Sequence, residues 1–106
     1  MNAGTPIVST YRDDALGDHD AVCLRAAIEA RAVHPDEILA AAMERARLAH
    51  GELNAVAAWA RSPVVGTGPF AGLPTFVKDN ESVAGLPERQ GSRAVSPVPR
   101  PESSEF

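Results

Sequence analysis

The sequence is poor in several residue types, and each shortage excludes a class of protein. It has one lysine against nine arginines, one cysteine and five aromatic residues in a chain of 106. A single cysteine excludes an internal disulfide and a cysteine-based metal cluster.

The net charge of −4, with no basic stripe, argues against nucleic acid or an anionic membrane surface as a partner. No apolar run reaches the ~18 residues of a membrane helix, and the N-terminus lacks a secretory pattern, so we expect a cytoplasmic location.

Length and composition predict one domain or part of one, with a thin core. A compact domain of this size buries roughly 65% of its unfolded surface. The hydrophobic fraction of 44% is ordinary for a globular protein, but much of it is alanine, which buries little area per residue. The chain divides into an arm at 1–19, a helical hairpin at 20–50, and strands and loops at 51–106 that are rich in proline and glycine.

Two helices are expected in the middle part. Asp20, or Asp18, can cap the first, and Pro35 suits the first position of the second, which we expect to end with a glycine cap at His50-Gly51. Apolar residues recur at helical spacing at Leu24, Ala27 and Ile28, then at Leu39, Ala42, Met43 and Ala46. Cys23 falls in the first pattern, which favours buried packing. The three histidines lie at helix edges and are interpreted as terminus residues.

Strands are expected in the last part. Residues 53–60 form a pattern of weak strand propensity, and Leu73 to Val77 form a stronger one despite Pro74. The predicted fold class is therefore α/β, with an αα-hairpin followed by strands of a mixed sheet. The arm at 1–19 is predicted to be loosely ordered.

Lys78, the only lysine, stands at the end of this second apolar run. Arginine does not release its proton in a protein, whereas a lysine withdrawn from water can. Lys78 is therefore a candidate proton-transfer group, and a strand end inside a sheet would give it the desolvated position that this role needs. The alternative is that an arginine-rich composition left one lysine by chance.

Four short segments around Lys78 resemble the opening of an amidase signature enzyme. They occur in the family's order: Gly72-Leu73-Pro74, Val77-Lys78-Asp79-Asn80, Val83-Ala84-Gly85-Leu86-Pro87 and Gly91-Ser92-Arg93. The helical hairpin and the Leu53-Asn54-Ala55-Val56 segment are similar to the family's N-terminus. The resemblance runs from about residue 13 to 106, and it implies an incomplete amidase signature domain.

The resemblance implies a Ser–cis-Ser–Lys triad in which Lys78 carries protons and no metal or organic cofactor is used. A serine hydroxyl is a weak nucleophile that needs such a base. Asp79, Asn80, Gly91 and Ser92 would be supporting positions. Asp79 and Asn80 are equally well explained as turn-forming residues.

The chain also departs from the family. The two serines of the triad belong to a glycine- and serine-rich segment that this sequence does not contain. Ser103-Ser104 has no neighbouring glycines, so we interpret it as a solvated tail. Glu81-Ser82 stands where relatives carry an apolar–acid pair.

The resulting prediction is an amidase that hydrolyses a small carboxylic amide to an acid and an amine or ammonia. The fragment alone is expected to be inactive, marginally stable, and prone to self-association or to pairing with a complementing chain. One alternative is a non-catalytic remnant or split-gene subunit that associates with another chain. A weaker alternative is a fragment of a glutamine amidotransferase subunit.

Overall fold

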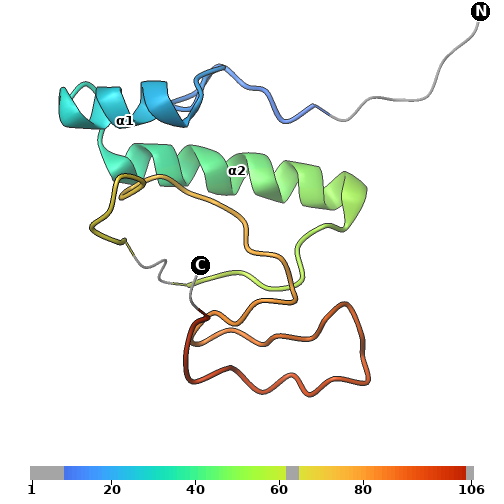
Figure 1. Ribbon diagram of the computed structural model, residues 1–106. Helices are drawn as coiled ribbons and strands as arrows, with labels where there is room; N and C mark the ends of the chain where they lie inside the picture. Colours follow the sequence, from blue (N-terminus) through green and yellow to red (C-terminus); the bar gives the residue numbers. More distant parts are fainter. Residues whose placement is uncertain (1–8, 62–64, 105–106) are drawn as a thin grey trace, which may run out of the picture. The chain divides into compact units, whose positions relative to one another are not determined.

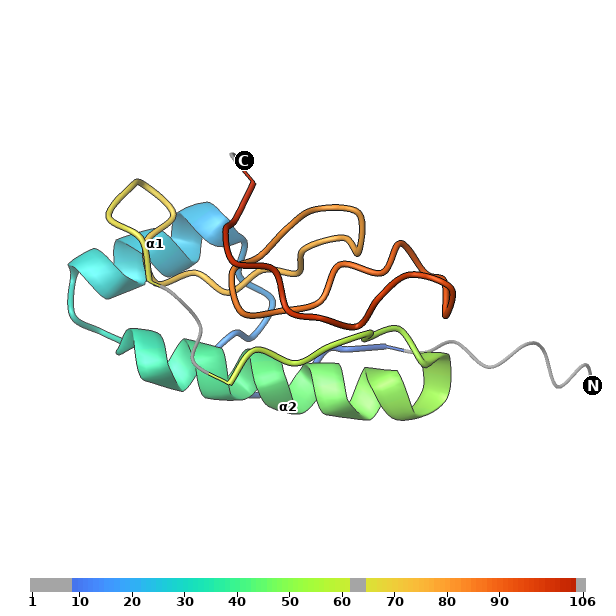
Figure 2. The ribbon, with the colours of Figure 1, turned by 90° about the horizontal axis from the view of Figure 1, so that it is seen from below.

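The computed structural model describes residues 9–61 and 65–104, and its regular structure is two helices (Figure 1). Helix α1 spans Ala21–Glu29 and helix α2 spans Pro35–Leu53. The chain forms two compact units: a helical unit of Met1–Ala55 and Val65–Pro74, and a loop unit of Val56–Val64 and Thr75–Phe106. Within the helical unit, α1 and α2 run in opposite directions and form the expected hairpin (Figure 2).

The helix starts follow from local capping. The Asp20 Oδ1 atom accepts a hydrogen bond from the Cys23 N–H at 2.9 Å, so Asp20 is the cap of α1. His34 caps α2, because its Nδ1 accepts from the Asp36 N–H at 3.1 Å while the Glu37 carboxylate accepts from the His34 N–H at 2.9 Å. Pro35 occupies the first turn of α2, as predicted.

The end of α2 differs from the prediction. The helix continues through Gly51 to Leu53, and Asn54, with φ 50° and ψ 46°, provides the left-handed cap. The Asn54 N–H donates to the His50 carbonyl at 2.8 Å. Asparagine tolerates this conformation better than most residues, so it terminates the helix in place of the expected glycine.

The predicted α/β architecture with a mixed sheet is wrong for this chain. The described residues contain the two helices and no strand. Leu53 is the last residue of α2, and the alanine-rich segment after it has low strand propensity. In the second segment Pro74 lacks the N–H that a ladder requires. Neither segment forms a strand in the described part of the chain.

The core is as thin as the composition predicted. Among the described hydrophobic side chains, three are buried: Leu24, Ile38 and Ala46. Leu24 and Ala46 were expected on the apolar faces, whereas Ile38, which is fully buried, was missed. Cys23 is exposed, and its predicted burial is wrong because it lies on the outer face of α1. All three core residues lie in the helices.

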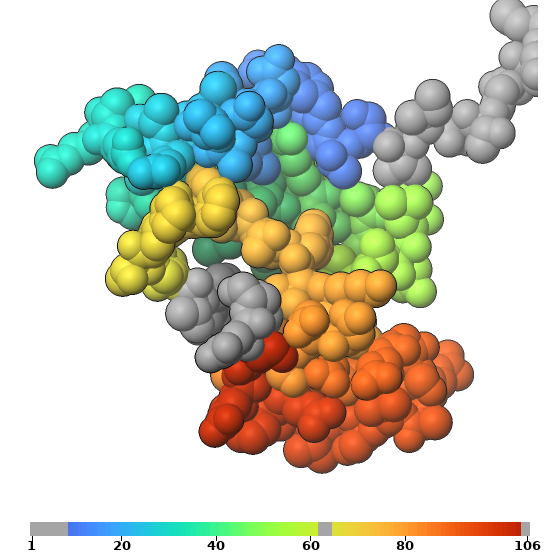
Figure 3. Space-filling view, viewed as in Figure 1, coloured from blue at the N-terminus to red at the C-terminus, as the bar shows by residue number. Residues whose placement is uncertain are grey.

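The segment at 65–72 lies against both helices of this unit (Figure 3). Gly72 has φ +83°, a conformation that favours glycine. A Cβ at this position would stand 3.2 Å from both Cβ and Cγ of Pro35 and 3.5 Å from Cδ1 of Ile28. Because Gly72 has no side chain, its backbone can lie close to the end of α1 and the start of α2.

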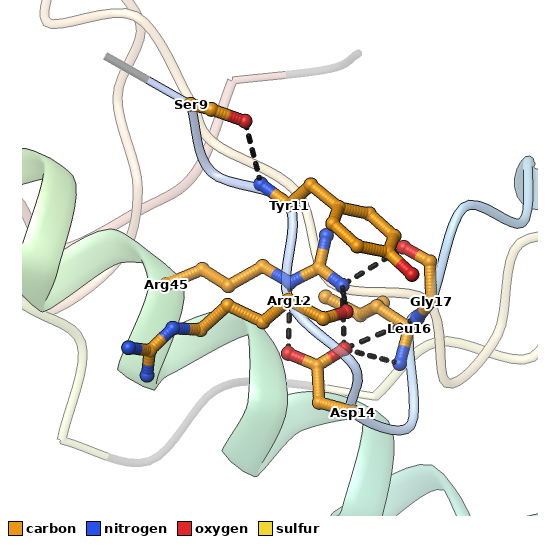
Figure 4. Close-up of polar contacts among 7 residues, drawn as sticks. All are labelled: Ser9, Tyr11, Arg12, Asp14, Leu16, Gly17 and Arg45. Carbon is orange, nitrogen blue, oxygen red and sulfur yellow. Dashed lines mark hydrogen bonds and ion pairs between the residues drawn. The ribbon is translucent and has the colours of Figure 1, made fainter.

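The described part of the arm is pinned to α2 by Arg45 (Figure 4). Its guanidinium binds the Asp14 carboxylate through two hydrogen bonds, of 2.8 Å from Nε and 2.5 Å from Nη2. Nη2 also donates to the carbonyls of Arg12 and Gly17, and the guanidinium lies 5.8 Å from the centre of the Tyr11 ring. The prediction of a loose arm is wrong for residues 11–17; residues 1–8 lie outside the described range.

The hydrogen bond from Arg45 holds the pKa of Asp14 down to about 2, from its ordinary value of 3.8. Backbone N–H groups of Gly17 and Leu16 also donate to this carboxylate. Both side chains of the pair are largely shielded, with 14% of Arg45 and 20% of Asp14 exposed. This pair joins residues that are 31 positions apart in sequence.

Candidate site around Lys78

Lys78 lies in a tight turn of the loop unit. The Lys78 carbonyl accepts a hydrogen bond from the Glu81 N–H at 3.0 Å, which closes the turn at 78–81. The Lys78 side chain is exposed. The expectation that a sheet desolvates it is wrong in this structure, because a strand end is enclosed only where strands pair around it, and the described residues form no strand.

Asp79 is the most highly connected residue of the predicted site. Its Oδ1 accepts from the Arg89 N–H at 2.9 Å, and its Oδ2 accepts from the Gly91 N–H at 3.1 Å. The Asp79 carbonyl accepts from the Gln90 N–H at 2.8 Å. Three consecutive backbone donors thus bind one residue. The pKa of Asp79 is lowered from 3.8, first by the Arg89 hydrogen bond and then by that of Gly91.

The loop at 89–92 presents these donors because it turns through two left-handed residues. Gln90 has φ 52° and Gly91 has φ 71°. The Ser92 N–H donates to the Arg89 carbonyl at 2.9 Å, which closes the turn. Successive N–H groups in such a turn form a concavity that binds an anion, and here the anion is the Asp79 carboxylate.

The structure therefore brings together three of the five predicted site residues: Lys78, Asp79 and Gly91. Asn80 occupies the exposed end of the lysine turn. The Ser92 hydroxyl accepts from the Ala94 N–H at 3.1 Å, so it organises its own loop. Sequence reasoning placed Asp79 and Gly91 among the supporting positions but did not identify the bond between them.

The serines near the C-terminus are part of the folded loop unit. The Ser104 hydroxyl accepts from the Ser82 N–H at 3.1 Å, and the Ser103 hydroxyl accepts from the Ala84 N–H at 2.9 Å. Ser103 is exposed, as a solvated tail predicts, but both serines are attached to the loop unit by these hydrogen bonds. Their hydroxyls accept hydrogen bonds from the backbone and hold the tail beside 82–86.

A second polar group supports the same region and was missed from the sequence. The Glu88 carboxylate accepts from the Ser82 hydroxyl at 2.8 Å and lies 3.4 Å from Nη2 of Arg100. The Glu88 side chain is only 12% exposed. The Gly85 N–H donates to the Arg100 carbonyl at 2.8 Å, which joins the same segments. These partners are too far apart in sequence to form a recognisable motif.

Neither a metal site nor a membrane helix is found in the described residues. No group of three or more histidine, cysteine, aspartate or glutamate side chains there could hold a metal ion. None of the helices in residues 9–61 and 65–104 is long and apolar enough to span a membrane.

Comparison with known proteins connects the chain to amidases. It is 41% identical over 105 residues to a Mycobacterium leprae protein named "Putative amidase AmiC", which covers 93% of this chain and 22% of that protein. Proteins of the same name from Mycobacterium bovis and Mycobacterium tuberculosis are 41% identical over 107 residues, covering 93% of this chain and 23% of theirs. The chain is therefore similar to part of these proteins.

That similarity supports a relationship to amidases, but the aligned region is a small part of each relative's length. The chain spans less than a quarter of their length. No protein-family model matches the chain, and no solved structure matches it.

Proposed function

We propose that this chain forms the N-terminal part of an amidase signature enzyme that hydrolyses a small carboxylic amide to an acid and an amine or ammonia. The observation that carries the proposal is the 41% identity to amidase-named proteins over 93% of the chain. The resemblance around Lys78 gives the reaction type and the residue roles. Both serines of the triad would come from polypeptide outside these 106 residues.

In the proposed reaction Lys78 transfers a proton and forms no bond to the substrate. The bridging serine passes the proton of the nucleophilic serine to the neutral amine of Lys78 as the serine oxygen attacks the amide carbon. The C–N bond then breaks, the proton returns to the departing nitrogen, and an acyl-enzyme remains. Water, deprotonated by the same route, attacks the acyl carbon; the bond from that carbon to the serine oxygen then breaks, the proton returns to the serine oxygen, and the acid leaves.

The exposure of Lys78 is compatible with this role. A proton carrier must meet a partner hydroxyl at hydrogen-bond distance, ~2.6–3.2 Å. Lys78 projects from a turn whose backbone is held by hydrogen bonds, and its own side chain is exposed. In the proposed enzyme the segment bearing the two serines covers this amine and desolvates it, which favours the neutral form that acts as a base.

A grafted protein tests the proposal. Residues 1–106 would replace the matching part of the Mycobacterium tuberculosis relative, and release of ammonia or amine would be followed on aliphatic and aryl amides. We expect turnover that Lys78→Ala abolishes. Lys78→Arg is expected to be nearly as damaging, since arginine keeps the charge but does not release its proton. Arg47→Ala, which removes an exposed positive charge from α2, is the matched control.

Three results would contradict the proposal. If Lys78→Arg retained most of the rate, Lys78 would be a structural cation and would carry no protons. If the grafted protein folded but had no activity, the chain could not supply the N-terminal part of an active amidase. That result would favour the alternative of a non-catalytic remnant or subunit. Glutamine-dependent transfer in place of hydrolysis would indicate an amidotransferase.

A further inference from the structure

We propose that Asp79 is a positioning residue for Lys78: it ties the turn that carries the lysine to the loop that carries Gly91, and so sets the direction in which the lysine side chain leaves the backbone. This inference rests on the proposed function, because positioning matters only if Lys78 takes part in the reaction. It assigns a specific task to a residue that the sequence alone explains equally well as a turn former.

The geometry fixes the backbone on the C-terminal side of Lys78. The peptide unit that leaves Lys78 is held at its carbonyl by the Glu81 N–H, at 3.0 Å. The next residue, Asp79, is bound through both carboxylate oxygens and its own carbonyl. Rotation about the backbone at 78–79 would have to break several of these bonds together. These contacts, most of them made by Asp79, hold the backbone on the C-terminal side of Lys78 and so restrict the direction of its Cα–Cβ bond.

The contacts require a carboxylate at this position. Two backbone N–H groups, those of Arg89 and Gly91, each bind a different oxygen of Asp79. An ionised carboxylate accepts at both oxygens, whereas an asparagine amide has one acceptor oxygen and an NH₂ group that would face the second donor. The lowered pKa of Asp79 keeps it ionised well below neutral pH.

The partner loop is also shaped for this contact. Gly91, at φ 71°, adopts a left-handed conformation that favours glycine, as Gln90 does before it at φ 52°, and this turn directs the Gly91 N–H toward Asp79. The motif residues Asp79 and Gly91, 12 positions apart, thus form one unit. In the chain, Lys78 directly precedes Asp79 and Ser92 directly follows Gly91.

The experiment compares Asp79→Asn and Asp79→Ala with Glu81→Gln in the grafted protein. Glu81→Gln removes a carboxylate from the same turn while its backbone N–H, the group that binds Lys78, is retained. We expect both Asp79 variants to lower kcat about 10- to 100-fold with KM nearly unchanged, because a displacement of about 1 Å in a catalytic group costs about 10²-fold. Glu81→Gln should retain the parent kcat. Rates would be divided by the fraction of the protein that is folded and whose active site can be titrated.

Amide NMR on the 106-residue chain supplies the second readout. In the parent chain the Gly91 and Arg89 amide protons should shift together as Asp79 is titrated, and both responses should vanish in Asp79→Asn. An active grafted protein whose kcat per folded molecule is unchanged by Asp79→Asn would overturn the positioning role, and leave the proposed function standing. Absence of the coupled amide shifts would show that the contact itself is wrong. An inactive grafted protein with intact amide shifts would instead refute the proposed function, and with it the role of Asp79 in catalysis.

Discussion

Replacing Gly72 by alanine tests how the segment at 65–74 is held against the helices. Gly72 has φ +83°, and its added Cβ would lie 3.2 Å from two carbons of the Pro35 ring. The ring is fixed to the backbone of the first turn of α2, so it cannot rotate away as a flexible side chain would. Relief requires the segment or the helix start to move by a few tenths of an ångström.

The magnitude follows from two contributions. A non-glycine residue in a left-handed conformation costs about 1–2 kcal/mol. Overfilling a packed contact adds typically about 1–3 kcal/mol, and the contact here is mild, which favours the lower half of that range. We expect Gly72→Ala to lower the free energy of unfolding of the helical unit by roughly 2–4 kcal/mol. Because only three hydrophobic side chains are buried in residues 9–61 and 65–104, this is a large fraction of the total stability.

The assay is thermal and urea unfolding of the chain, followed by far-UV circular dichroism, which reports α1 and α2. Three glycines provide matched controls in the same unit. Gly66→Ala meets nothing within 4 Å and should change stability little. Gly17→Ala, at φ +51° with its nearest contact at 3.4 Å, should show the conformational cost alone. Gly51→Ala, inside α2 with open space, should stabilise by about 0.5–1 kcal/mol.

The order of stability among these variants tests the contact at Gly72. If Gly72→Ala were no more destabilising than Gly17→Ala, crowding by Pro35 would contribute nothing, and the close approach in this corner would be refuted. If Gly72→Ala matched Gly66→Ala, the left-handed conformation at Gly72 would be refuted as well.

Three further predictions concern the chain as it stands. The purified 106 residues should not hydrolyse simple amides, because they contain a base without its nucleophile; turnover that disappears in Lys78→Ala would contradict this. The Asp14–Arg45 pair should stabilise the helical unit fully above pH 4 and lose this effect as the pH falls from about 4 to about 2, since the pKa of Asp14 is lowered from 3.8 to about 2. Asp14→Asn should remove that part of the acid dependence in unfolding titrations, and an unchanged pH profile would refute the pairing. Asp20 raises the pKa of the exposed Cys23 thiol, so alkylation by iodoacetamide at pH 8 should be faster in Asp20→Asn, which retains a capping side chain; equal rates in the two chains would show that Asp20 does not act on the thiol.

Local chemistry determined the parts of this protein that the sequence predicted correctly. Asp20 and Pro35 mark the helix starts because a cap acts within three residues of itself. The apolar spacing of Leu24 and Ala46 identified two of the buried positions, and the grouping of residues around Lys78 identified the relationship to amidases.

Contacts between distant residues decided the rest. Arg45 binds Asp14 across 31 positions, and Asp79 binds Gly91 across 12; no local periodicity encodes either pair. The expected strands did not form, because a strand exists only where another segment pairs with it, and sequence pattern alone does not supply that partner. The same reason explains Lys78: its place after an apolar run was visible in the sequence, whereas its exposure depends on what the folded chain packs around it.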